Sequence, residues 1–177
     1  MAQLTPGTWN LDASHSEIGM TVRHAGISKV RAIFEESEAT LIVSEGDVAT
    51  LDARVKANSF NSKNADRDGH VRGEDFLDAE KFPELTFVSD SITASGEEFE
   101  ITGDLTIRGV TKTVTFEVEF GGQAVDPFGA TRAGFSANTV ISRKEFGLTW
   151  NASLEAGGVL VGDKVSIDLE AAFVLAQ

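Results

Sequence analysis

The side chains best suited to chemistry in this chain are its three histidines, His15, His24 and His70. Three imidazoles can hold a zinc ion, and a histidine beside a carboxylate can transfer protons. No two of the histidines stand four residues apart, which is the spacing that places two ligands on one face of a helix. The spacing therefore favours hydrogen-bonded histidines over a metal site, and we predict neither a metal nor a cofactor.

A wider group of polar residues surrounds two of these histidines. Asp68 and His70, beside Arg67, lie in a segment that has no strand pattern. If this segment folds over the end of a barrel, its side chains meet those at the ends of the first strands. Such a network could pin the segment, orient a ligand head group or catalyse a reaction, and the sequence favours pinning. This polar group consists of His15, Ser16, His24, Arg31, Asp68 and His70.

Composition argues against several classes of function. The 177 residues carry a net charge of −13, which repels the phosphates of nucleic acids and disfavours docking on anionic membranes. The chain has no cysteine, which excludes disulfides and cysteine nucleophiles. It has no apolar run of about 18 residues, and its first residues do not resemble a signal peptide. We therefore expect a cytoplasmic protein without a membrane span, or a periplasmic or secreted one if a leader has been removed.

The dominant pattern is an alternation of apolar and polar residues, which is typical of strands with one dry face. At the C-terminus, Val165, Ile167 and Leu169 alternate with Ser166 and Asp168. About eight such stretches predict an all-β fold, a closed antiparallel barrel in a single domain over residues 1–177. The predicted strands cover 18–23 with an extension towards Trp9, 30–43 with a polar interruption at 35–38, 51–57, 85–93, 99–107, 114–120, 133–141 and 165–175.

Two long connections, 58–84 and 143–163, interrupt the strand pattern. In the first, Asp66 and Asp68 favour a helix N-terminus and Pro83 favours a helix end, which predicts a short helical segment. Its apolar face would carry Val71, Phe76, Leu77 and Ala79. Connections of this length are typically lids or plugs, so we expect both to cover parts of the barrel.

The predicted dry face mixes large and small side chains. Small residues leave space beside aromatic rings, and apolar space destabilises a fold unless a ligand fills it. A tapered core in which large and small residues interdigitate produces the same pattern, so both interpretations stay open. The large residues are Phe34, Phe87, Phe99, Phe116, Phe120, Phe135 and Phe173, and the small ones are Ala53, Ala57, Gly103, Ala133, Ala137 and Ala171.

Motifs in a fixed order resemble those of the YceI-like family. They include Trp9-x-Leu11-Asp12-x-x-His15-Ser16-x-Ile18, Val22-x-His24-x-x-Ile27-Ser28-x-Val30-Arg31, Arg67-Asp68-x-His70, Phe82-Pro83-x-x-Thr86-Phe87, Gly103-x-Leu105-Thr106-Ile107 and Ile141-x-Arg143-x-x-Phe146-Gly147. The resemblance spans about residues 9 to 175, with Ala32 as a mild departure.

The resemblance implies a lipocalin-like, eight-stranded barrel with an apolar tunnel. Members of the family bind polyisoprenoids, quinone tails or other long amphiphiles, several are dimers, and many are periplasmic. The resemblance implies no catalytic residues, and the family's recurrent polar positions coincide with the polar group. We therefore expect a homodimer that binds a lipid-like small molecule and no nucleic acid.

These observations predict a non-enzymatic carrier or store for a polyisoprenoid, quinone or fatty-acid-like chain held inside the barrel. One alternative is a small enzyme that uses the histidine, aspartate and arginine of the polar group on an apolar substrate. Another is a dimeric interaction protein with a filled core. The predicted tunnel contacts are Ile18, Met20, Val22, Phe34, Phe87, Leu105, Phe116, Phe135, Phe146 and Trp150, with the polar group near one end.

Overall fold

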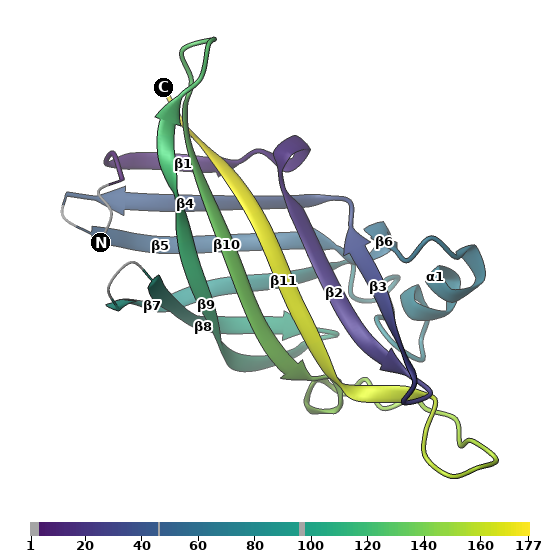
Figure 1. Ribbon diagram of the computed structural model, residues 1–177. Coiled ribbons are helices and arrows are strands. Elements are labelled where there is room, and N and C mark those ends of the chain that lie inside the picture. The colour runs from purple at the N-terminus through teal and green to yellow at the C-terminus, as the bar shows by residue number, and fades with distance from the viewer. Residues whose placement is uncertain (1–3, 46, 96–97) are drawn as a thin grey trace.

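The computed structural model describes residues 4–45, 47–95 and 98–177, and its strands form one antiparallel sheet. Eight of them follow one another around a ring that the pairing of the first with the last closes into a barrel (Figure 1). The predicted eight-stranded antiparallel barrel is therefore confirmed. In ring order the strands are β1 (Gly7–Leu11), β4 (Ser37–Ser44), β5 (Asp47–Lys56), β7 (Glu84–Ser95), β8 (Glu98–Ile107), β9 (Val110–Val125), β10 (Thr131–Ser142) and β11 (Val161–Leu175).

The first two predicted strands are each divided in two. A 3-10 turn, η1 (Ala13–His15), separates β1 from β2 (Glu17–His24), and a bend at residues 35–36 separates β3 (Ser28–Phe34) from β4. β1 pairs with β4, whereas β2 pairs with β3. The β2–β3 hairpin therefore extends beyond the ring along β11, as Figure 1 shows.

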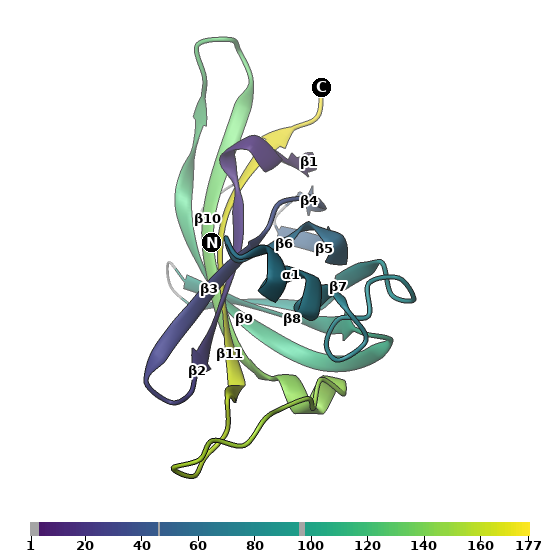
Figure 2. The same ribbon diagram turned by 90° about the vertical axis from the view of Figure 1, so that its right-hand side faces the viewer.

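A short helix lies at the end of the barrel towards which this hairpin extends (Figure 2). The two-residue strand β6 (Phe60–Asn61) pairs with β3, and α1 (Ala65–Arg72) follows it. Asn64 caps α1 by accepting a hydrogen bond from the backbone N–H of Arg67 at 3.0 Å. In the described residues, no helix is long and apolar enough to cross a membrane.

The predicted short helical segment is confirmed, but it ends at Arg72 and does not reach Pro83. The next residue, Gly73, has an extended backbone and donates its N–H to the carbonyl of His70. Glycine is a poor helix former, and the extended backbone at Gly73 ends the helix well before Pro83. Phe76 and Leu77 therefore follow the helix in turns, where they are buried under the barrel end.

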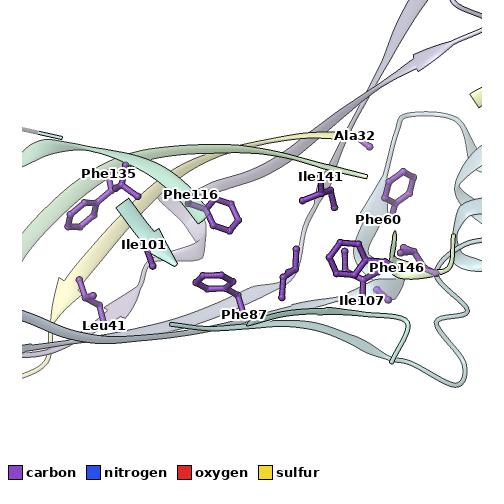
Figure 3. Packing of buried hydrophobic residues seen from close by; sticks show 14 of the residues in the cluster. Ala32, Leu41, Phe60, Phe87, Ile101, Ile107, Phe116, Phe135, Ile141 and Phe146 are labelled. Atoms are coloured by element: carbon purple, nitrogen blue, oxygen red, sulfur yellow. The ribbon is translucent and has the colours of Figure 1, made fainter. Parts of the chain in front are cut away.

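In the described residues, the half of the barrel away from α1, here called the solid half, is filled by large buried side chains such as Trp9, Phe99 and Phe173. Across β10 and β11, Ala133 faces Phe173 and Phe135 faces Ala171, so a small residue lies opposite a large one at each step. The ring of Phe135 lies 6.1 Å from that of Phe99 and 5.8 Å from that of Phe173. The tapered-core interpretation therefore holds in this half, and Figure 3 shows Phe135 on the far side of Phe116 from Ile141.

A polar cluster stabilises the corner where the chain leaves the ring after β1. The Asp12 carboxylate accepts hydrogen bonds from Ser14 at 2.6 Å and from the Arg132 guanidinium at 2.7 Å. Arg132 also donates to Asp126, which joins β10 to the corner after β1. Ser14, Arg132 and His15 stabilise the carboxylate and hold the pKa of Asp12 well below its usual range.

This cluster predicts a defined loss of stability in acid. A carboxyl whose folded pKa is depressed stabilises the fold above its unfolded pKa of about 3.9, and that contribution disappears as pH falls through the folded value. We expect Asp12→Asn to cost about 1 kcal/mol at pH 7, because a neutral amide still caps η1 but loses the ion pair with Arg132. Between neutral pH and about pH 3, the free energy of unfolding measured in urea should fall less for Asp12→Asn than for the wild type. Asp52→Asn, at an exposed position outside this cluster, is the control. An equal fall in the free energy of unfolding of Asp12→Asn and Asp52→Asn would contradict the prediction.

Candidate ligand-binding cavity

A cavity of about 540 Å³ occupies the half of the barrel nearer α1. Its walls come from alternate residues of several strands, as expected where one face of each strand points inwards. A volume of about 300 to 1,000 Å³ is the usual range for small-molecule sites. The strand residues along the walls include Ile18, Met20 and Val22 of β2, Val30 and Phe34 of β3, Ala53 and Val55 of β5, Leu85 and Phe87 of β7, Leu105 and Ile107 of β8, Phe116 of β9, Ile141 of β10, and Val165, Ile167 and Leu169 of β11.

Two aromatic rings close the inner end of the cavity. Phe87 and Phe116 meet edge to face, with ring centroids 5.2 Å apart, between the cavity and the solid half of the barrel (Figure 3). Phe135 belongs to the solid half and does not border the cavity, unlike the other predicted tunnel contacts. Alternation assigned Phe135 to the inner face, but it carries no information on depth along the barrel axis.

The outer end of the cavity, here called the mouth, is covered by aromatic side chains from both long connections. The His70 ring lies 4.6 Å from that of Trp150 and 5.0 Å from that of Phe76, edge to face in each case. His70 Nε2 is 2.9 Å from a carboxylate oxygen of Asp75, which holds the imidazole in this orientation. The connections therefore form a cover whose inner surface is apolar, as expected of a lid.

Arg143 is the polar residue that organises the second connection. Its guanidinium is buried and donates to the carbonyls of Leu148 at 2.6 Å, Trp150 at 2.9 Å and Gly162 at 2.8 Å, with a further bond to Val161. Burial lowers the pKa of Arg143. The side chain thus fixes the backbone that presents Leu148, Trp150 and Val161 to the cavity.

The structure does not assemble the predicted polar group at one place. His24 and His70 border the cavity near its mouth. His15 lies on the exposed turn η1 with Asp12, and the Ser16 hydroxyl bonds to the backbone of Asp12 and Ala172. All of these contacts on η1 lie away from the cavity.

The other two members also point elsewhere. Arg31 faces outwards from β3, opposite Thr21. Asp68 is buried, but its carboxylate accepts from the N–H and hydroxyl of Ser62, at 2.9 Å and 2.5 Å. Asp68 therefore pins α1 to the segment before it by a local bond, and it does not join the histidines in one network.

Several residues at the cavity were named in the sequence for other reasons and were not predicted as ligand contacts. Asp66 and Arg67 of α1 border the mouth, and Arg67 donates to the hydroxyl and carbonyl of Ser62. Arg143 had appeared only within a family motif. Hydrogen bonds from one side chain to distant carbonyls leave no periodic signal in a sequence, so residue spacing does not reveal this role.

The chemistry of the site is that of apolar burial. Carbon-rich side chains cover nearly all of the cavity surface, and the few polar residues that border it include His24 and, from α1, Asp66, Arg67 and His70. Among the described residues, no group of three or more histidine, aspartate or glutamate side chains could hold a metal ion. The arrangement can hold an elongated apolar molecule with one end near His24 and His70.

Comparison with known proteins supports this description. The model of the YceI-like domain matches residues 9–173. A UPF0312 protein of Staphylococcus aureus (strain USA300) is 33% identical over 172 residues, covering 96% of this chain and 98% of that protein. The crystal structure of Campylobacter jejuni YceI protein is 29% identical, with a TM-score of 0.76 and 100% coverage of both chains.

A more distant structure shares the fold. The polyisoprenoid binding domain from Saccharophagus degradans superimposes with a TM-score of 0.71 at 13% identity, covering 95% of this chain and 98% of that one. The family model matches nearly the whole chain, and the curated relative is similar over almost its full length. On this evidence the chain belongs to the YceI-like family.

Proposed function

We propose that this protein is a carrier or store for a long apolar or amphiphilic molecule, such as a polyisoprenoid, quinone or fatty-acid-like chain. The observation that carries the proposal is the cavity of about 540 Å³, which has apolar walls and lies inside a closed barrel. The fold shared with a polyisoprenoid binding domain supports the same class of ligand.

Burial alone can supply the affinity. An isoprenoid or acyl chain that buries about 400 Å² of apolar surface gains about 10 kcal/mol, at about 25 cal/mol per Å². Association costs about 4 kcal/mol or more, which leaves a favourable balance without any charged contact. The ligand would lie along the barrel axis, with its tail at Phe87 and Phe116 and its head group near His24 and His70.

The alternative of a small enzyme requires histidine, aspartate and arginine to act together. In this structure Asp68 is bonded to Ser62, and Arg31 faces outwards on β3. His70 does pair with Asp75 at the cavity, but the His70 ring packs against the aromatic rings of Phe76 and Trp150. The separation of the polar group therefore favours a carrier.

Organic extraction followed by mass spectrometry tests this proposal. Protein purified without detergent should release an apolar molecule at up to one per chain, and native spectra should show the matching loss of mass. The extracted protein should then bind a fluorescently labelled geranylgeraniol saturably, in competition with unlabelled geranylgeraniol, decylubiquinone or oleate. Absence of both extractable ligand and saturable binding would refute the carrier function.

The homodimer and the location in the cell stay predictions. Dimerisation rests on the resemblance to the family, and light scattering of the eluting protein would measure it directly. A mass of one chain at concentrations where the ligand binds would contradict the predicted homodimer.

A further inference from the structure

We propose that the β2–β3 hairpin is a docking element for the surface of an anionic lipid bilayer. This inference rests on the proposed function, because a carrier of apolar chains must exchange its ligand with a membrane. The hairpin reaches from β2 across the turn at residues 25–27 into β3, beside the mouth of the cavity. It combines cationic side chains with exposed apolar ones.

The charge of the hairpin is opposite to that of the whole chain. Residues 18–34 contain Arg23, Lys29 and Arg31 and no aspartate or glutamate, within a chain whose net charge is −13. Among the ion pairs within the described ranges, none includes any of these three cations. The overall charge repels an anionic membrane at a distance, but screening confines that repulsion to about 10 Å, so a surface that touches the hairpin itself meets its three cations.

The cations lie close enough to repel one another, which destabilises the hairpin unless an anion neutralises them. Arg23 lies directly opposite Lys29 in the antiparallel ladder, and like charges at such positions repel. Arg31 lies two residues beyond Lys29, on the same face of the strand, opposite Thr21. Phosphate groups of a lipid surface would neutralise all three from one side.

Apolar side chains project from the same edge. Ile27, in the turn of the hairpin, is 85% exposed, and Val159, in the second connection, is 49% exposed. The two segments are joined, because the Ala25 N–H donates to the Leu160 carbonyl at 2.7 Å. Leu160 and His24 border the cavity beside this junction. Ile27 and Val159 would therefore enter the acyl region next to the mouth.

A bilayer fits this surface better than an acidic protein does. Exposed isoleucine beside arginine and lysine is the combination found in segments that lie at a membrane interface. An acidic protein would pair with the cations but would leave the isolated tip of Ile27 without an apolar pocket in which to insert. Docking on a bilayer also brings the mouth to the phase in which the ligand dissolves.

Vesicle flotation tests the proposal with the full chain. The wild type should bind phosphatidylcholine vesicles that contain about one third phosphatidylglycerol, with weaker binding to pure phosphatidylcholine and at about 0.5 M salt. The double variant Lys29→Gln/Arg31→Gln should bind the anionic vesicles about 25-fold more weakly, at about fivefold per cation. Ile27→Ser should weaken binding about tenfold.

The control variant Lys63→Gln/Lys112→Gln makes the same change of charge at exposed positions outside the hairpin and should keep wild-type binding. Removing Lys29 relieves its repulsion with Arg23, so the melting temperature of the double variant should not fall. Equal vesicle binding by the two double variants, or no preference of the wild type for anionic vesicles, would overturn the proposal. Binding of labelled geranylgeraniol in solution reports separately on the proposed function, because it requires no vesicle.

Discussion

Replacing Arg143 by alanine is expected to destabilise the fold by at least about 3 kcal/mol. Its guanidinium supplies the donors for buried or half-buried carbonyls of Leu148, Trp150, Val161 and Gly162. A buried acceptor left without a donor costs about 1–3 kcal/mol, and alanine would leave several. Urea unfolding measures the loss as a lower transition midpoint. Labelled geranylgeraniol should also bind more weakly, since the freed connection carries part of the mouth.

Two further variants show whether the bonds of Arg143 are responsible. Arg143→Lys keeps the charge but lacks the planar fork that reaches several carbonyls at once, so its loss of stability should be intermediate. Lys144→Ala changes the exposed neighbouring residue and should cost less than about 0.5 kcal/mol. If Arg143→Ala unfolded at the same urea concentration as Lys144→Ala, the organising role of Arg143 would be wrong.

The barrel could be predicted because alternation reports which face a residue occupies. Val165, Ile167 and Leu169 alternate with polar neighbours, and all three point into the cavity. The break at residues 35–36 was also visible, because two glutamates interrupt an apolar strand where β3 turns into β4. These features depend on local spacing, which a sequence records directly.

The position of a residue along the barrel axis could not be predicted from alternation. Phe116 and Phe135 both point inwards from neighbouring strands, yet Phe116 closes the cavity and Phe135 lies in the solid half. Their positions depend on the stagger between β9 and β10, which includes a register shift at Gly134 and Phe135. The sequence therefore supported a hollow barrel and a tapered core equally, and the structure contains each in one half.

The hydrogen-bond partners of the polar group could not be predicted from the sequence either. The sequence places His15 and His70 in one group because a folded-over connection would bring them together, but η1 holds His15 with Asp12 on the outside. Asp68 found its partner six residues away, at Ser62, and not at a histidine. Short-range hydrogen bonds of this kind compete with long-range ones, and composition cannot decide between them.

Ala53→Trp should abolish most of the ligand affinity while leaving the barrel folded. Ala53 lies on the inner face of β5, opposite Phe87, where its small side chain borders the cavity at the inner end. An indole there would exclude about 100 Å² of ligand surface, which removes about 2.5 kcal/mol. Labelled geranylgeraniol should therefore bind about 50-fold more weakly, as measured by fluorescence titration.

Thr50→Trp provides the matched control, because it places the same side chain on the exposed face of the same strand. It should leave the affinity unchanged. The melting temperature of Ala53→Trp should equal or exceed that of the wild type, since the ring fills apolar space that otherwise lacks protein contacts. Overpacking would lower it, in which case the smaller Ala53→Phe separates a folding defect from a blocked cavity. A folded Ala53→Trp or Ala53→Phe variant that bound geranylgeraniol as tightly as Thr50→Trp would show that the ligand does not occupy the barrel.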